Sequence, residues 1–430
     1  MQLIYNTIKS LAYVLTEPYY LIILVVVGIV CYLKNKKIVF MNNMIIGESS
    51  QSALDLTLSQ IVIGIFGGIL ASILLTLAGV VFEETSYIQI LFVISIILMF
   101  IKPRYICFSY SAAILGFISI LVSAFSKDMA ADSKMFNIDI TMLMSFVAIL
   151  HIVEALLVVI DGHRSAIPVF SDKNGTIIGG FALKRNWIVP IAIFIAYTIN
   201  STQIGGTESI STPGWWPIIT SATNNEIFNT MAIVSLPLWG VIGYSSVTFT
   251  KKKEQKSRMS ALCIFLFGIV LLMISQIARL GVVWKIIVVI LTPLCHEVML
   301  RIQNILESKK QPKFVSDNEG YSILEVVKYS RSYEFGFRSG DKVLSINGEN
   351  IESEKEIYKA LKIGGSLIKI ISDKGVEKTI KIEQNSKDRM GILIVPKKVD
   401  VSRTIAVGQE QDAFSNILKK VKNKKWKGAS

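Results

Sequence analysis

Residues 320–383 read GYSILEVVKYSRSYEFGFRSGDKVLSINGENIESEKEIYKALKIGGSLIKIISDKGVEKTIKIE. Alternating buried-type residues predict a first strand over 323–327, and the Gly340-Asp341 turn leads into a second strand over 342–346. Ser353 and Glu356 have the spacing of a capping box, so a helix should follow. Two further strands are expected at 366–372 and 377–382, on either side of a turn. The order of elements predicts a small α+β barrel.

The centre of this stretch, Gly336 to Gly348 (GFRSGDKVLSING), resembles the bacterial PDZ core pattern G-L-x-x-G-D-x-I-x-x-[IV]-N-G. The resemblance implies a domain that binds peptide C-termini or internal strands by strand addition and performs no chemistry itself. The usual S-P-A stretch is Ser330-Arg331-Ser332 here, and no clear carboxylate-binding loop is visible. The residues predicted to bind peptide are Phe314, Val315, Tyr321, Ser322, Ile323, Ile357 and Leu361.

The remainder of the chain has the composition of a membrane protein. Hydrophobic residues make up 52% of the sequence and charged residues 18%, and the mean hydropathy is +0.53. Three regions are predicted: a polytopic membrane domain over 1–303, a PDZ domain over 313–384, and a last strand, linker and tail over 385–430. The expected fold class is an α-helical polytopic membrane protein followed by a small α+β PDZ-like domain.

Nine apolar segments are predicted to cross the membrane as helices, two of which are short enough to be partly re-entrant. They are 19–33, 60–82, 87–101, 105–125, 138–160, 187–200, 227–249, 259–278 and 280–300. Lys and Arg between alternate segments place the N-terminus outside and the C-terminus inside the cell membrane of a bacterium. A model with eight spans keeps the PDZ domain cytoplasmic.

The net charge of +13 is explained by this preference of Lys and Arg for the cytoplasmic side, and it does not indicate nucleic-acid binding. The final segment, 413–427, predicts a basic amphipathic helix on anionic membrane lipid, and a disordered basic tail is the alternative. Its membrane-surface residues are Lys419, Lys420, Lys422, Lys424, Lys425, Trp426 and Lys427.

The loop 161–186 contains a hairpin signal, since two apolar runs flank Asn174-Gly175. Its role is either a cap on the cytoplasmic side or a docking surface for a partner.

A site-2-type intramembrane metallopeptidase would need H-E-x-x-H on one helix and an Asp, often in D-G, on another. The nearest match is His296-Glu297-Val298-Met299-Leu300, in which Leu300 replaces the second histidine. Asp161-Gly162 precedes this segment, which reverses the protease order. The sequence therefore predicts no catalytic residue, no cofactor and no metal, and leans against an enzyme. The four cysteines look like small lipid-facing or packed residues.

Four ionisable residues in apolar segments form a candidate membrane-embedded polar cluster: His151, Glu154, His296 and Glu297. His296 and Glu297 are expected near the cytoplasmic end of the last span. Such residues are costly at membrane depth and suggest a function. A structural cluster, a proton-coupled or ion-coupled site and a metal site all remain open.

The layout of the whole chain resembles MinJ-type division-topology proteins, on the architecture, on the Gly336–Gly348 run, and on 153–155 and 161–164 preceding Pro168-Val169-Phe170. The resemblance implies a non-enzymatic membrane scaffold that recruits cytoplasmic division or polarity proteins, DivIVA-like and MinD-like. The alternatives are a divergent metallopeptidase, or a transporter with helices broken at Pro190, Gly205-Gly206 or Pro237 that uses the polar cluster.

Overall fold

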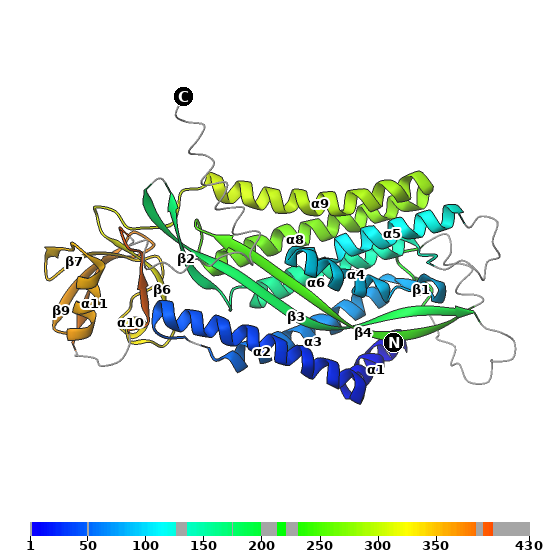
Figure 1. Cartoon of the computed structure of the whole chain (residues 1–430), viewed down its shortest axis with the longest axis horizontal. Coiled ribbons are helices and arrows are strands. Elements are labelled where there is room, and N and C mark those ends of the chain that lie inside the picture. Colours follow the sequence, from blue (N-terminus) through cyan, green and yellow to red (C-terminus); the bar gives the residue numbers. More distant parts are fainter. Residues whose placement is uncertain are drawn as a thin grey trace, which may run out of the picture.

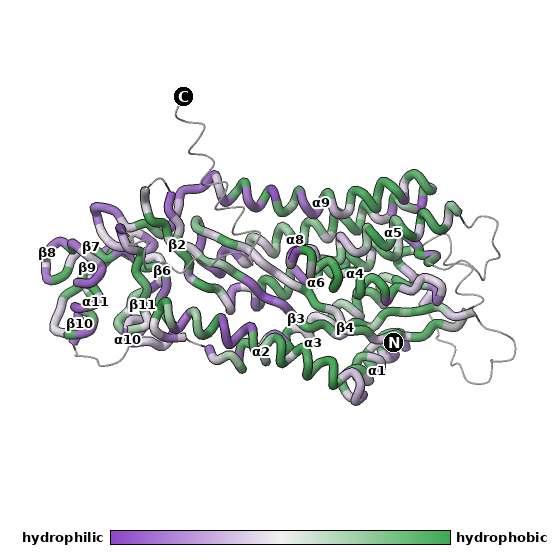
Figure 2. Tube along the Cα trace, in the orientation of Figure 1, coloured by the Kyte–Doolittle hydropathy of each residue, from purple (hydrophilic) through white to green (hydrophobic). Residues whose placement is uncertain are grey.

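The computed structural model describes residues 2–49, 51–125, 136–173, 175–198, 213–220, 231–383 and 390–398. The molecule is elongated, with a body of helices around long strands and a smaller sheet at one end (Figure 1). The body is mostly apolar along its length, whereas the smaller sheet mixes polar and apolar residues (Figure 2).

The body contains eight helices within the described residues. They are α1 (Gln2–Thr16), α2 (Pro18–Ile46), α3 (Ala53–Ala78), α4 (Ile90–Ile101), α5 (Phe108–Phe125), α6 (Ile140–Asp161), α8 (Lys253–Ser275) and α9 (Val282–Lys309). Short 3-10 turns join some of them: η1 (Glu84–Ser86), η2 (Pro103–Ile106) and η4 (Gln276–Leu280). Local signals set several ends, such as the Ser52–Asp55 capping box of α3 and the Asp139 cap of α6.

Five of the described helices are long and apolar enough to cross a membrane: α3, α5, α6, α8 extended through η4, and α9. The bent pair α1 and α2, with an angle of 67° between them, would add a sixth if it forms one span. The chain is thus a membrane protein that is only partly helical. The prediction of nine spans is wrong, and so is the alternative of eight.

Two of the expected spans, 187–200 and 227–249, fall largely in the long strands β3 (Thr176–Thr198) and β4 (Met231–Thr248). The two strands pair in antiparallel register, with Pro190 opposite Trp239 and Ala192 opposite Pro237. The expectation failed because a run of Val and Ile is equally apolar in a helix and in a buried strand. Pro190 and Pro237 therefore do not break helices, and Gly205-Gly206 lies outside the described residues.

Strands at membrane depth must satisfy their backbone groups within the protein. β3 does this through β4 on one edge and through β1 (Val81–Glu83, parallel) and β2 (Ile167–Lys173, antiparallel) on the other. Between these partners, the N–H of Ala192 donates to Ser72 Oγ of α3 at 2.9 Å. α3 can come this close because Gly64 and Gly68 have no Cβ. A Cβ at either position would lie 2.1 Å from a carbonyl oxygen of β3. Glycine in α3 thus allows a helix to cover the strand.

The predicted hairpin is present: β2 and β3 pair in antiparallel register up to Lys173 opposite Thr176.

The smaller sheet lies beyond the membrane helices and has the strand order β10-β9-β7-β6-β11, with β8 paired to β7. Its strands are β6 (Tyr321–Val326), β7 (Lys342–Ile346), β8 (Glu349–Asn350), β9 (Ser366–Ile371), β10 (Glu377–Ile382) and β11 (Ile392–Ile394). Two helices accompany them, α10 (Arg331–Glu334) and α11 (Glu354–Ile363), and the predicted capping box of Ser353 is present. The predicted strands and helix are confirmed. The expected last strand is also present, as β11, and it pairs with β6 in this sheet.

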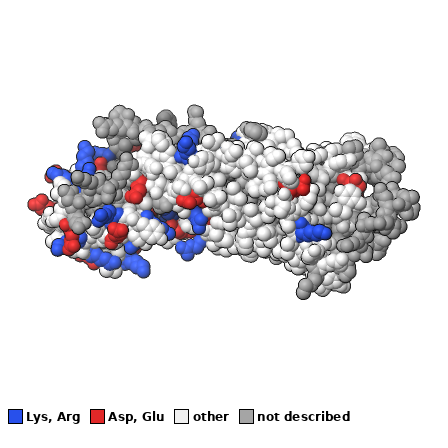
Figure 3. All heavy atoms as spheres, turned by 90° about the horizontal axis from the view of Figure 1, so that it is seen from below, with Lys and Arg blue, Asp and Glu red and all other residues white. Residues whose placement is uncertain are grey.

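This sheet is packed onto the body and is not a free arm. Strand β5 (Phe314–Val315) pairs with Ile178 and Gly179 of β3. Phe314 is fully buried, its ring 5.6 Å from that of Phe181. Lys253 also pairs with Glu325 at 2.7 Å. Charged side chains gather over this end of the molecule, whereas the adjoining face of the body is largely uncharged (Figure 3).

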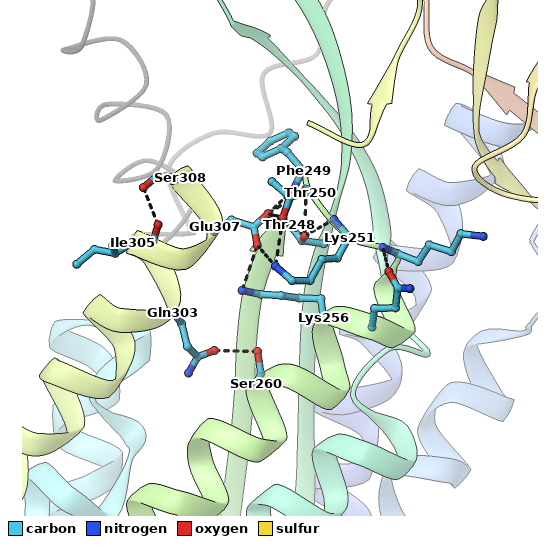
Figure 4. A network of polar contacts seen from close by, with 12 residues as sticks. Thr248, Phe249, Thr250, Lys251, Lys256, Ser260, Gln303, Ile305, Glu307 and Ser308 are labelled. Carbon is cyan, nitrogen blue, oxygen red and sulfur yellow. Dashed lines mark hydrogen bonds and ion pairs between the residues drawn. The ribbon is translucent and has the colours of Figure 1, made fainter. Parts of the chain in front are cut away.

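A polar network secures the junction where β4 leads into α8 (Figure 4). Glu307 near the end of α9 accepts hydrogen bonds from the hydroxyl groups of Thr248 and Thr250 and from backbone N–H groups. It also pairs with the buried ammonium groups of Lys251 at 3.3 Å and Lys256 at 3.6 Å. Glu307 therefore links α9 to the start of α8.

Candidate functional site

The structure brings the four residues of the candidate polar cluster together inside the body. His151 lies near the midpoint of α6 and His296 near the midpoint of α9. Their ring centroids are 5.8 Å apart, and both side chains are buried. His296 was expected near a helix end, but α9 continues to Lys309 and places the histidine halfway along the helix.

A cysteine completes the cluster. Cys107 Sγ lies 3.1 Å from Nε2 of His151 and 3.5 Å from Nε2 of His296. The ligand atoms of the three residues all lie within 4.8 Å of one another. Cys107 was expected to be a packed or lipid-facing residue. Cys107 is indeed packed inside the body, but its sulfur lies between two imidazoles, a position that the sequence did not indicate.

Cys107 reaches the histidines because it ends the turn η2 between the short helix α4 and α5. The carbonyl of Ile106 in this turn accepts a hydrogen bond from Ser95 of α4. The ring of Phe108, the next residue, stacks edge-on against Phe92 of α4 at 5.3 Å and Phe146 of α6 at 6.4 Å. These contacts hold the helical hairpin α4–η2–α5 against α6, with its turn at the cluster.

Each histidine has a hydrogen-bond partner at its other ring nitrogen. Nδ1 of His151 lies 2.8 Å from the carbonyl oxygen of Val147, one turn back on α6. A carbonyl can only accept, so Nδ1 carries the proton and Nε2 presents a lone pair toward Cys107. Nδ1 of His296 lies 3.2 Å from the hydroxyl oxygen of Tyr110, whose own proton goes to Glu297 at 2.6 Å. The same tautomer therefore follows for His296.

Glu297 does not point at Cys107 and the two Nε2 atoms. It contacts the cluster through Tyr110. Its carboxylate accepts from Tyr110 and pairs with Arg104 of η2 at 3.0 Å. These two bonds orient Tyr110, which in turn orients His296.

Glu154 lies on the other side of the cluster, with its carboxylate 3.8 Å from Nε2 of His151. Together with Cys107 and His151 it lines a cavity of about 20 Å³, whose other walls come from α5, α6 and β4. A volume of this order holds about one water molecule. Cys107 and His151 therefore face a small space that is also lined by a carboxylate.

A second buried polar cluster lies at the end of α6. Asp161 and Arg185 are fully buried and joined by bonds of 2.5 and 3.1 Å. Trp187 donates to Asp161 at 2.8 Å, and Arg185 also donates to the Leu56 carbonyl and to Ser59. Asp161 therefore pairs with Arg185. A site-2-type metal site would instead need this aspartate close to His296. Leu300, in the place of the second histidine, packs against the hydrophobic core.

The residues predicted to bind peptide do not line an open edge of the smaller sheet. Phe314 and Val315 form β5 and pair with β3. Tyr321, Ser322 and Ile323 lie in β6, which has a partner strand on each side. Ile357 and Leu361 of α11 are fully buried in the core of the smaller sheet. The edge strand of the sheet that lies beside α11 is β11. No residue of β11 was predicted to bind peptide.

The basic tail from Lys419 to Lys427 lies outside the described residues.

The signals for the missed residues are present in the sequence but weak. Cys107 and Tyr110 follow Pro103-Arg104, which interrupts two apolar runs. An arginine at such an interruption was interpreted as a membrane-side marker, whereas the structure uses it to hold Glu297.

Comparison of the chain with models of known protein families, with curated proteins and with solved structures finds no match. The fold is that of a partly helical membrane protein with an α+β domain packed onto its body.

Proposed function

We propose that this chain is a non-enzymatic membrane scaffold that recruits cytoplasmic division or polarity proteins, DivIVA-like or MinD-like, through a PDZ-like domain. One observation carries the proposal: β11 is the outermost strand of the smaller sheet and lies beside the helix α11. PDZ domains bind peptides as an added strand at such an edge.

The residues of β11 are buried, so a peptide that pairs with its outer edge would first displace the side chain that covers it. The N–H of Ile394 is directed away from β6 and donates to the hydroxyl of Tyr358 on α11 at 3.2 Å. The N–H of the next residue, Val395, points the other way and donates to Ser322 of β6. This alternation is that of an antiparallel edge strand, so an added strand could replace Tyr358 as the acceptor.

The backbone just before β11 is held in place by its neighbours, since a Cβ at Gly391 would lie 2.4 Å from Cβ of Ser330. Gly391 has φ +61°, a conformation that glycine adopts at little cost. Its carbonyl accepts from Val327, which fixes the start of β11 against β6. Met390 and Ile392 flank it and are buried in the domain core.

The contacts between the domain and the body suit a scaffold. Leu324, Leu393 and Val395 of the domain pack into the main hydrophobic core of the body. A partner bound at β11 would therefore be held at a fixed place beside the membrane, and this supports recruitment over loose tethering.

The test is fluorescence microscopy of the host's division and polarity proteins in cells that carry the full chain or a Tyr358→Trp variant. The larger ring should block a strand from entering between α11 and β11, so recruitment to poles and septum should be lost while the variant stays in the membrane. Tyr358→Phe is the matched control and should recruit as the unaltered chain does. Recruitment that survives both Tyr358→Trp and removal of residues 313–398 would contradict the proposal.

A further inference from the structure

We propose that Cys107, His151 and His296 bind a zinc ion at the middle of the membrane body, a role separate from peptide recruitment. One thiolate and two imidazoles are a ligand set that suits zinc among the common divalent ions.

The spacing of the three atoms matches a metal centre. Tetrahedral zinc, with bonds of about 2.3 Å to sulfur and about 2.0 Å to nitrogen, places sulfur and nitrogen ligands about 3.5 Å apart. The two distances from Cys107 Sγ to the Nε2 atoms are 3.1 and 3.5 Å. The ligand atoms of all three residues lie within 4.8 Å of one another, so side-chain rotations would bring the third ligand onto the same ion.

The hydrogen bonds around the histidines are those of metal ligands. A ligating histidine usually donates its other N–H to a carbonyl, a carboxylate or a similar acceptor, which fixes the ring and its tautomer. His151 donates to the Val147 carbonyl, and His296 donates to Tyr110, which Glu297 and Arg104 hold in place. Both Nε2 lone pairs therefore face Cys107, whose single S–H proton could serve only one of them. Ser109 Oγ lies 3.4 Å from Nε2 of His151, at the long end of the hydrogen-bond range, so its hydroxyl is at most a weak donor to that lone pair.

The zinc would have three protein ligands and one open position. Structural zinc sites are closed by four protein ligands, whereas three ligands and an open position are typical of catalytic sites. The cavity of about 20 Å³ beside Cys107 and His151 supplies that position, and Glu154 lines it. The broken His-Glu motif on α9 therefore does not exclude a metal, because Cys107, at the turn between α4 and α5, takes the place of the missing histidine.

The direct test is metal analysis of the full chain in lipid nanodiscs, after loading with zinc and removal of the excess by gel filtration. We expect one zinc per chain in the unaltered protein and in Cys295→Ser, and almost none in Cys107→Ser or His296→Asn. Cys295 is a matched control, because it precedes His296 on α9 and points about 100° away from it around the helix.

Cobalt substitution tests the sulfur ligand without relying on the folding of a variant. Cobalt in the unaltered chain and in Cys295→Ser should give a thiolate-to-cobalt charge-transfer band in the near ultraviolet. Absence of this band, no zinc in the loaded unaltered protein, or full zinc retention in Cys107→Ser would each overturn the proposal. Circular dichroism and gel filtration confirm that each variant remains folded.

Discussion

Two buried polar clusters lie on α6, and they differ in how completely their atoms are paired. Asp161 at the helix end has Arg185 and Trp187 as donors, and Arg185 in turn has Leu56 and Ser59 as acceptors. At the middle of the helix, His151 and His296 turn two lone pairs toward one sulfur atom. The first cluster satisfies itself, whereas the second leaves room for a cation.

The comparison teaches that burial of ionisable groups does not by itself indicate a functional site. In a closed cluster every donor and acceptor has a partner within the protein. Removal of one member therefore leaves a buried charge unpaired and destabilises the fold. Convergent acceptors with few protons between them indicate a ligand instead.

The largest expected effect is that of breaking the closed cluster. Asp161→Ala should destabilise the protein by about 3–5 kcal/mol, because it leaves the Arg185 guanidinium buried and unpaired. The measurement is the thermal unfolding midpoint in detergent, together with the amount of protein in the membrane. Arg164→Ala is the control, since Arg164 also pairs with Asp161 but is 40% exposed, so its loss should cost less than about 1 kcal/mol. Equal effects of the two changes would contradict this interpretation.

At the cluster of Cys107, His151 and His296, the stability of the folded protein should depend on zinc more than on a single substitution. Zinc at a hundredfold excess over its dissociation constant should stabilise the unaltered chain by about 2.7 kcal/mol, because it binds the folded state. Cys107→Ser should unfold close to the metal-free unaltered chain and show no increase with zinc. Thermal midpoints with and without zinc measure this. A zinc-dependent increase of equal size in Cys107→Ser would assign the stabilisation to another site.

Glu307 provides an intermediate case, because its network is closed but less deeply buried. Glu307→Gln should cost about 1–3 kcal/mol, since it leaves the buried Lys256 ammonium without its carboxylate. Gln303→Ala is a useful comparison, because Gln303 lies one turn earlier on α9 and accepts only the neutral hydroxyl of Ser260. Differential scanning fluorimetry of the two variants checks the order. A smaller loss for Glu307→Gln than for Gln303→Ala would be inconsistent with an ionic role.

The smallest effect is expected at the exposed contact between domain and body. Partial burial acts to raise the pKa of Asp373, but hydrogen bonds from Lys313 and Lys252 and their charges outweigh it and lower the pKa. The ionised carboxylate therefore stabilises the folded state above the unfolded pKa of about 3.9, and this stabilisation is lost as pH falls through the folded pKa. The loss should stay below about 1 kcal/mol because the group is solvated.

Thermal midpoints of the unaltered chain and of Asp373→Asn, recorded from about pH 6 to about pH 3, test this. The difference between them should shrink as the solution becomes acidic. Glu377→Gln serves as the control, since its exposed pair with Lys369 lies within the domain. A difference that grows toward low pH would contradict the assignment.

Local patterns predicted the smaller domain well. The Ser353 capping box, the Asn347-Gly348 turn and the alternating strands act over a few residues, so the sequence around them decides the outcome. The same holds for the hairpin of β2 and β3. These elements formed as expected because their determinants are close in the chain.

Long-range packing decided the rest. The run from Trp187 to Ala196 is apolar enough for a membrane helix, but it is a strand because α3, with Gly64 and Gly68, and β4 cover it. No local signal shows that such a cover exists.

The sequence by itself determined that this is a membrane protein, where the small sheet and the hairpin form, and which histidines and glutamates enter the apolar region. Only the tertiary structure decided which apolar runs are strands and which cysteine joins the histidines. The physical reason is distance along the chain: Cys107 meets His151 across 44 residues and His296 across 189. Contacts of that length depend on how all the helices pack together, and no short segment encodes them.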